Sequence, residues 1–176
     1  SDENLDSDIE LNKVLHNRYG GSFDIHHSMT PLSAQEGEHI GFVLVIQDVT
    51  ESHRLLRQLS YSASHDALTG LPNRSSFESQ LKGLLKVLPG SDQSHALSML
   101  DLDLFKAVND SAGHAAGDAL LNEIASLMRS MLRPSDILAR LGGDEFGFIL
   151  RHCSTEQALN ATERIVDAIK HYEFTW

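Results

Sequence analysis

The strongest constraint on the fold is a Gly142-Gly143 pair that lies between two apolar runs. Glycines at such a place allow positive backbone dihedrals, so we predict a tight antiparallel hairpin whose tip carries Asp144 and Glu145. Because glycine has no Cβ, a ligand could also approach the main chain closely here. Two interpretations stay open: a simple turn with solvated carboxylates, or a ligand site at the hairpin.

Apolar periodicity in the C-terminal two thirds of the chain predicts a mixture of strands and amphipathic helices. We expect strands over residues 96–100, 137–141 and 146–150, and helices over residues 77–88, 105–109, 117–132 and 156–171. Strands and amphipathic helices in this order are typical of a sheet covered by helices. The predicted fold class is therefore an α/β or α+β sandwich.

Residues 9–50 have a different pattern, with strand-like segments, a turn at Gly20-Gly21 and a polar loop over residues 31–38. About three antiparallel strands bury little surface by themselves. The apolar run at residues 42–46 therefore suits either a two-sided core or a dimer contact.

After Thr50 the apolar period changes from two to about 3.5 residues, which predicts a helix over residues 51–64. One stripe of this helix consists of Leu55, Leu56, Leu59 and Ala63, and the other side carries Arg54, Arg57 and Gln58. A packed linker helix and a parallel dimer stalk both agree with this pattern.

Charge and composition exclude several classes of function. The 176 residues carry a formal net charge of −11, from 14 Lys and Arg against 25 Asp and Glu. Binding to a nucleic-acid polymer relies on a basic surface, so we expect none. The longest apolar stretch, residues 41–46, is far shorter than the roughly 20 residues that span a bilayer. One cysteine, Cys153, cannot form an intrachain disulfide, which fits a reducing compartment.

A second acidic group, Asp101-Leu102-Asp103, ends the predicted strand at residues 96–100. Carboxylates and main-chain carbonyls at a strand end are suitable ligands for a hard divalent cation. If this strand lies beside the hairpin, Asp101 and Asp144 can share a magnesium ion. For Asp103 the alternative is that it caps the following helix.

Residues 106–118 form a polar segment with glycines, which contains the loop between the helices predicted over residues 105–109 and 117–132. Asn109 and Asp118 offer donor and acceptor groups that suit the edge of a purine. The alternatives are a turn for Asn109 and a helix cap for Asp118. His114 by itself is typical of a structural residue, and the ten histidines show no zinc-site spacing.

Four segments of the sequence, in this order, resemble the motifs of the GGDEF diguanylate cyclase domain. They are Asp66-Ala-Leu-Thr-Gly-Leu-Pro-Asn-Arg74, Asp101-Leu-Asp-Leu-Phe-Lys-Ala-Val-Asn-Asp110, Gly113-His-Ala-Ala-Gly-Asp118 and Ala139-Arg-Leu-Gly-Gly-Asp-Glu-Phe146. Residues 19–51, which end in Asp-Val-Thr-Glu, resemble the C-terminal half of a PAS sensor domain. The resemblance implies a PAS-like piece over residues 1–50, a signalling linker helix over 51–65, and a GGDEF domain over 66–176 that we expect to be truncated at its C-terminus.

The resemblance implies a nucleotidyl-cyclase-like, palm-type fold with a central antiparallel sheet. It also implies that a homodimer condenses two GTP into cyclic di-GMP and releases pyrophosphate. Asp101, the Leu102 carbonyl and Asp144 would hold Mg²⁺ or Mn²⁺, and Glu145 would be either a further metal ligand or the base beside the attacking hydroxyl. The residues implied in GTP binding are Lys106, Asn109, His114, Asp118, Gly142 and Gly143.

Arg133 and Asp136 resemble the Arg-x-x-Asp site at which the family binds cyclic di-GMP as an inhibitor. An Arg fork suits phosphate or the edge of guanine, and an Asp can accept hydrogen bonds from guanine. Alternatively, a helix ends near Arg133 and Asp136 occupies a turn.

The resemblance further implies control by the PAS-type sensor and a bacterial cytoplasmic location. Members of the family also occur attached to membranes and fused to phosphodiesterase domains, and this chain is compatible with either. The competing hypothesis is a non-catalytic module for GTP or cyclic di-GMP binding or for dimerisation. The presence of both Asp144 and Glu145 favours catalysis.

Overall fold

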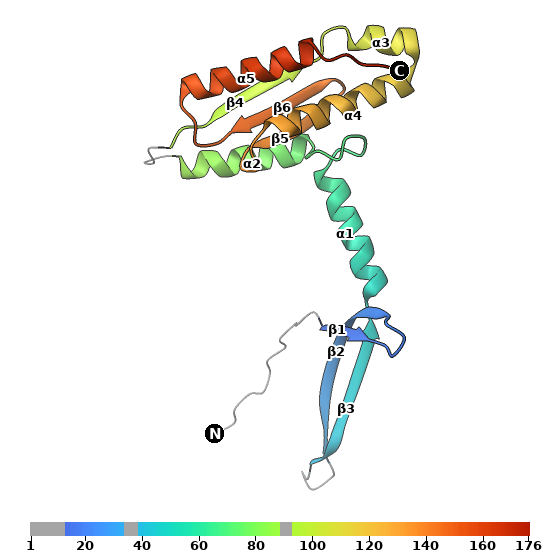
Figure 1. The fold of residues 1–176 in the computed structure, drawn as a ribbon. Helices are drawn as coiled ribbons and strands as arrows, with labels where there is room; N and C mark the ends of the chain where they lie inside the picture. Colours follow the sequence, from blue (N-terminus) through green and yellow to red (C-terminus); the bar gives the residue numbers. More distant parts are fainter. Residues whose placement is uncertain (1–12, 34–38, 89–92) are drawn as a thin grey trace. The chain divides into compact units, whose positions relative to one another are not determined.

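The predicted glycine hairpin is present, and it belongs to a three-stranded sheet (Figure 1). The computed structural model describes residues 13–33, 39–88 and 93–176. Strands β5 (Ile137–Gly142) and β6 (Glu145–Leu150) form the hairpin, and β4 (Ala96–Asp101) pairs with the other edge of β6. Both pairings are antiparallel. The predicted strands are therefore confirmed.

Helices cover both faces of this sheet, which confirms the α+β fold class (Figure 1). They are α2 (Arg74–Val87), α3 (Phe105–Ala112), α4 (His114–Met131) and α5 (Thr155–Lys170). Because side chains alternate along a strand, Phe146 and Phe148 pack into one cluster with α4 and α5. Ile137 and Ile149 pack on the opposite face against Phe77 of α2. The sheet is the centre of both apolar clusters.

Two helix starts differ from the prediction. Helix α2 begins three residues earlier than expected, because Asn73 caps it by accepting a hydrogen bond from the Ser76 amide at 3.0 Å. Helix α4 also begins three residues earlier than expected, and α3 continues to Ala112, so the loop predicted between these two helices is shorter than expected. Gly113, with φ of 87°, makes the break between these two helices.

The N-terminal part contains a second antiparallel sheet, in the order β1 (Lys13–His16), β2 (Ser22–Ser33) and β3 (His39–Asp48). This confirms about three strands, although the predicted residues 9–12 and 34–38 lie outside the described residues. Residues 31–33 belong to β2 and not to a loop. Among the described residues, β2 beyond Ile25 pairs with β3 alone, which makes it an edge strand, where a proline such as Pro31 is tolerated.

The apolar run of β3 is exposed in the part of the chain that the structure describes. Its side chains from Phe42 to Ile46 are between 41% and 65% exposed. No other described residues bury these apolar side chains of β3, so the structure does not decide between a two-sided core and a dimer contact.

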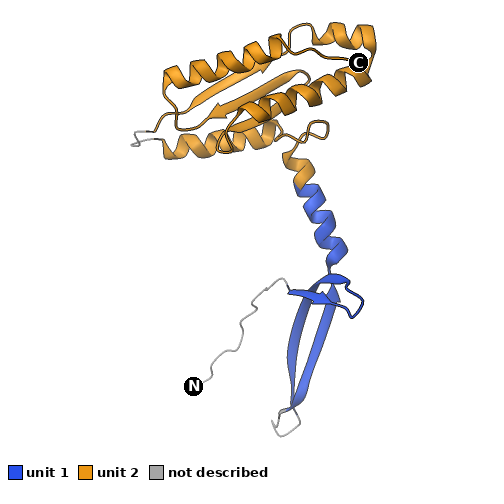
Figure 2. Cartoon of the chain, viewed as in Figure 1, with its two compact units in different colours: residues 1–60 blue, residues 61–176 orange. Residues whose placement is uncertain are grey.

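The chain divides into two units, residues 1–60 and residues 61–176, and helix α1 (Thr50–Ser64) contains the boundary (Figure 2). The predicted helix is confirmed. None of its residues is buried against the described part of the chain. Within that part, no helix combines the length and the apolar character needed to cross a membrane.

Candidate metal and nucleotide site

The end of β4 lies beside the hairpin tip. Asp101 is the register partner of Glu145, which confirms that the strand carrying Asp101 neighbours the hairpin. Gly142 pairs with Glu145, so the two loop residues are Gly143 and Asp144. Gly142 has φ of 142° and Gly143 has φ of 55°, as expected for positions that favour glycine. The fold thus brings Asp101 next to the adjacent acids Asp144 and Glu145, which lie far from it in the sequence.

These acids repel one another. Asp144 is the main cause of a raised pKa at Asp101, and burial, Glu145 and Asp103 add to the rise. A raised pKa means that the neighbouring charges disfavour the carboxylate form of Asp101. A bound divalent cation would reverse this effect, because it becomes the largest local charge.

The residues suit a divalent cation that arrives with a nucleotide and completes its shell with ligands from outside the protein. Among the described residues, no group of three or more His, Cys, Asp or Glu side chains is arranged to hold a metal. Mg²⁺ usually takes only one or two protein carboxylates and fills its shell with water and substrate phosphates. Asp101 and Asp144 meet that need, and the Leu102 carbonyl lies in the same turn, where it accepts the Phe105 amide at 3.3 Å.

The expected capping role of Asp103 is wrong. The N-cap position of α3 is Leu104, and no side chain caps the helix. Leu104 has φ of 63°, a left-handed conformation that is uncommon for a residue with a Cβ. The strained turn directly follows Asp101 and Leu102, where the chain leaves the sheet.

Arg140, a residue of β5, is hydrogen-bonded to the hairpin tip. Its guanidinium donates to the Gly143 carbonyl from Nε at 2.9 Å and from Nη2 at 2.7 Å, and Nη1 donates to Asp66 Oδ1 at 3.0 Å. Asp66 also accepts hydrogen bonds from the amide and hydroxyl of Thr69. Sequence reasoning assigned no role to this pair, although both residues lie in the motifs quoted above. A register shift between Arg140 and Gly142 adds a bulge next to the site.

Removing the charge of Asp66 is expected to weaken the fold in a pH-dependent way. Asp66→Asn should lower the free energy of unfolding by about 1.5–3 kcal/mol at neutral pH, because the Arg140 side chain, which is 12% exposed, loses its charged partner. Burial alone would raise the pKa of Asp66, but hydrogen bonds from Thr69 and Arg140 outweigh it and hold the pKa below the usual 3.8. Because the pKa of Asp66 is lower in the folded state, its carboxylate stabilises the fold fully at pH values above the unfolded-state pKa of 3.8. This stabilisation is lost as the pH falls through the folded-state pKa.

Denaturant unfolding of both proteins across the acidic range measures this effect. The difference between wild type and Asp66→Asn should be constant near neutral pH and should shrink below about pH 4. Asp167→Asn, at a pair that is 74% exposed on the Asp side, is the control and should stay within about 0.5 kcal/mol of wild type. A difference that persists unchanged at low pH would contradict the ion-pair explanation.

Arg74, the first residue of α2, contacts the second acid of the hairpin. Its Nη2 donates to Glu145 Oε2 at 2.9 Å, and its Nε donates to the Leu141 carbonyl at 3.0 Å. Sequence reasoning missed this contact as well, because no periodicity links residues so far apart in the chain.

The residues expected to bind guanine lie on α3 and α4. Asn109 is half-buried in α3 and packs against Gly117 of α4, where an added Cβ would overlap the Asn109 side chain. The expected alternative of a helix cap for Asp118 is wrong, because Asp118 lies inside α4 and Gly113 holds the N-cap position. Asp118 is exposed and directly follows Gly117 in the chain. The two helices therefore bring Asn109 next to the segment that carries Asp118.

Two further residues expected to bind GTP are exposed. Lys106 lies in the first turn of α3, and His114 is the first residue of α4. Both side chains are therefore accessible to a ligand.

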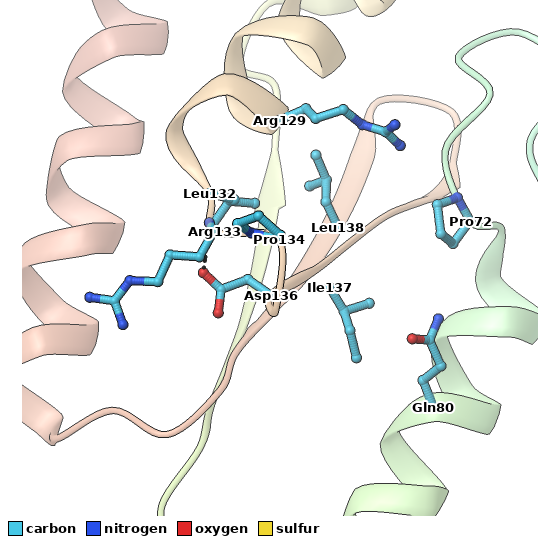
Figure 3. A pocket seen from close by; sticks show the side chains of 9 residues that line it. All are labelled: Pro72, Gln80, Arg129, Leu132, Arg133, Pro134, Asp136, Ile137 and Leu138. Carbon is cyan, nitrogen blue, oxygen red and sulfur yellow. Dashed lines mark hydrogen bonds between the residues drawn. The ribbon is translucent and has the colours of Figure 1, made fainter.

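Arg133 and Asp136 line a cavity of about 410 Å³ (Figure 3). The Asp136 carboxylate accepts the Arg133 amide at 3.0 Å and the Arg151 amide at 3.1 Å, so Asp136 has the turn role that was one of its two interpretations. Gln80 and Arg129 also line the cavity, and Figure 3 shows the Arg129 and Arg133 side chains pointing to opposite sides.

An antiparallel sheet between two helical layers, with acids at a glycine hairpin beside a strand end, agrees with the palm-type fold that the sequence resemblance implies. Comparison with known proteins agrees. The sequence model described as "Diguanylate cyclase, GGDEF domain" matches residues 63–176. The chain therefore belongs to the GGDEF domain family of diguanylate cyclases.

The chain is 64% identical over 170 residues to "Probable diguanylate cyclase DgcE" of Escherichia coli (strain K12), a match that covers 97% of this chain and 15% of that protein. It thus spans only a small part of this relative. Diguanylate cyclase SiaD from Pseudomonas aeruginosa, solved in complex with its activator SiaC, has a similar fold with a TM-score of 0.62, 36% identity, and coverage of 72% of this chain and 48% of that one.

The coiled coil and GGDEF domain of DgcB from Caulobacter crescentus, solved in complex with c-di-GMP, has a TM-score of 0.61 and 30% identity to this chain. That match covers 66% of this chain and 61% of that one.

Proposed function

We propose that this chain is a diguanylate cyclase module that condenses two GTP molecules into cyclic di-GMP and releases two pyrophosphates. The observation that carries the proposal is the pairing of β4 with β6, which brings Asp101 next to the hairpin acid Asp144. Membership of the GGDEF family supports the same reaction.

A divalent ion, Mg²⁺ or Mn²⁺, would be held by Asp101, Asp144 and the Leu102 carbonyl. When bound, it neutralises charge on the phosphoryl oxygens. A chain with a net charge of −11 repels a free triphosphate, which further supports a nucleotide that binds together with its metal.

The remaining residues would bind and orient GTP. Gly142 and Gly143 let phosphates approach the backbone, and Lys106 and His114 offer exposed donors on α3 and α4. The guanine edge would be read by Asn109 and Asp118. The 3′-hydroxyl of one GTP then attacks the α-phosphorus of the other, the bond to pyrophosphate breaks, and the reciprocal attack closes the ring. Each protomer supplies one GTP, so catalysis requires a homodimer.

The N-terminal part would control this module. We propose that residues 1–50 are the C-terminal part of a PAS-like sensor, that residues 51–65 are its signalling helix, and that the GGDEF domain acts in the bacterial cytoplasm, where GTP is available. Support comes from α1, which runs without a break from Thr50 to Ser64 and so reaches the family match, which begins at residue 63.

Product formation tests the proposal. The chain, and any longer natural form that contains it, is incubated with GTP and Mg²⁺ and the products are separated by chromatography. We expect cyclic di-GMP with two pyrophosphates per product molecule, and none when the metal is chelated. GTP binding without any cyclic di-GMP from either form would instead favour the non-catalytic binding module.

We propose in addition that the cavity at Arg133 and Asp136 binds cyclic di-GMP as an inhibitor. Arg133→Ala is expected to weaken product binding by about tenfold or more, because a charged hydrogen bond to phosphate or guanine is lost, and to raise the final yield of product. Calorimetric titration with cyclic di-GMP measures the first effect and progress curves measure the second.

Arg133 is a cleaner test of this cavity than Asp136. Because the Asp136 carboxylate binds two main-chain amides, its substitution would also change stability. Lys82→Ala, an exposed position on α2, serves as the control. Unchanged inhibition together with unchanged product binding in Arg133→Ala would rule out the inhibitory site.

A further inference from the structure

Asn73 contacts the ends of two helices. Its side-chain oxygen accepts the Ser76 amide at 3.0 Å and so caps the start of α2. Its side-chain amide donates to the Ala63 carbonyl at 3.0 Å, and its main-chain amide donates to the Ser64 carbonyl at 3.0 Å. The last carbonyls of a helix have no partner within that helix. Asn73 therefore satisfies the end of α1 and the start of α2 together.

The last turn of α1 belongs to the second unit, which begins at Tyr61. The Tyr61 ring stacks on the His65 ring, with 4.0 Å between the ring centroids. The chain then turns back, and His65 forms an isolated antiparallel bridge with Pro72. The Leu71 side chain is 1% exposed and lies in the apolar cluster of α4 and α5, so it anchors this turn in the core.

The residue before Asn73 is bound to the glycine hairpin. The Pro72 carbonyl accepts the Arg140 amide of β5 at 3.0 Å. The Arg140 side chain in turn donates to the Gly143 carbonyl at the hairpin tip. Because Pro72 and Asn73 are adjacent, one short segment of main chain is bound both to β5 and to the end of α1. A change at the end of α1 that moves Asn73 therefore also weakens the support of the hairpin.

We propose that Asn73 is a positioning residue that couples the order of the last turn of α1 to the order of the glycine hairpin, so that fraying of α1 at this end lowers turnover. The inference rests on the proposed cyclase function. It deepens the proposed control by α1, because it names the contact through which the helix acts. Such a coupling requires that a change at one place alters the other.

Asn73→Asp separates the two capping roles. Aspartate accepts the Ser76 amide as well as asparagine does, so the cap of α2 is kept. It cannot donate to the Ala63 carbonyl, and a negative charge at the C-terminal end of a helix is unfavourable. The substitution should therefore loosen the end of α1 and leave α2 intact.

Residue-resolved amide hydrogen exchange, with neither metal nor nucleotide present, measures the coupling. In Asn73→Asp, exchange should rise by about threefold to tenfold at residues 61–66 and also at residues 140–146, whereas the interior of α2 should be unchanged. Ala63→Gly weakens the last turn of α1 through helix propensity without changing Asn73, and it should raise exchange at the same two places. Faster exchange at residues 61–66 with an unchanged hairpin, or no change at either place, would overturn the inference.

Turnover gives a second measurement. Asn73→Asp and Ala63→Gly should each lower kcat for cyclic di-GMP formation by about threefold to tenfold, with KM for GTP within about twofold of wild type. If Asn73 had a merely structural role, kcat would follow the melting temperature and exchange would rise throughout the second unit. That result would contradict the positioning role.

Asn160→Asp makes the same change at an exposed asparagine of α5 and is the matched control. It should change neither kcat nor the exchange of the hairpin amides. If the wild type makes no cyclic di-GMP, the proposed function fails, whereas hydrogen exchange still decides whether the end of α1 and the hairpin are coupled.

Discussion

Asp144→Asn is expected to lower the rate of cyclic di-GMP formation by about 10²- to 10⁴-fold, because the loss of a metal ligand removes several kcal/mol of transition-state stabilisation. The stability of the fold should not decrease. Asp144 is the main cause of the raised pKa at Asp101, so removing its charge relieves a repulsion in the metal-free protein. The melting temperature should therefore be equal to that of wild type or higher, while activity is lost.

Initial rates with GTP and Mg²⁺, together with thermal melts in a chelator, measure the two effects. Asp167→Asn, an exposed carboxylate on α5, is the control and should change neither quantity. An Asp144→Asn protein that keeps wild-type activity would refute the metal assignment. A large loss of stability would show instead that Asp144 is structural.

Gly117→Ala is expected to raise KM for GTP by about tenfold to a hundredfold. An added Cβ would overlap the Asn109 Oδ1 position and would lie 3.1 Å from Phe105 Cζ, so the Asn109 amide must move from its place. Loss of hydrogen bonds to a base costs about 1–3 kcal/mol per unpaired buried group. Discrimination between GTP and ATP should fall for the same reason.

Gly83→Ala provides a matched control for this substitution. Gly83 lies in α2, and a Cβ there would meet nothing within 4 Å. It should raise stability by up to about 1 kcal/mol through helix propensity and leave KM for GTP unchanged. Steady-state kinetics with both nucleotides distinguishes the two variants. A Gly117→Ala protein with wild-type KM for GTP would show that Asn109 does not read the base from its present position.

Local patterns were sufficient to predict the strands and the hairpin, since each has an apolar run with clear ends. The loop predicted between the helices at residues 105–109 and 117–132 was too long, for a physical reason. Polar residues and glycines there suggested a long turn. In the structure α3 and α4 pack on each other, and Gly113 is the single residue between them. Pro31 also lies in a strand, because β2 is an edge strand there among the described residues, and an edge strand tolerates a proline.

The acidic residues of the site could be predicted from the sequence, whereas the arginines that bind to the hairpin could not. Asp101 and Asp144 follow from a strand end and a glycine turn, both of which are visible in the sequence. Arg140 and Arg74 act on partners about 70 residues away, Asp66 and Glu145, and only the folded chain brings these pairs together. The helix cap predicted at Asp103 failed for a related reason. Aspartate is a suitable capping residue, but the N-cap position of α3 is Leu104 and no side chain caps this helix.

The location of a bound metal tests the central claim most directly. Crystals grown with Mn²⁺ and a non-hydrolysable GTP analogue would give an anomalous peak at the ion. We predict one peak or more within coordination distance of the Asp101 and Asp144 carboxylates and the Leu102 carbonyl, with the guanine beside Asn109. A nucleotide bound elsewhere, or an ion without contact to Asp101 and Asp144, would contradict the account.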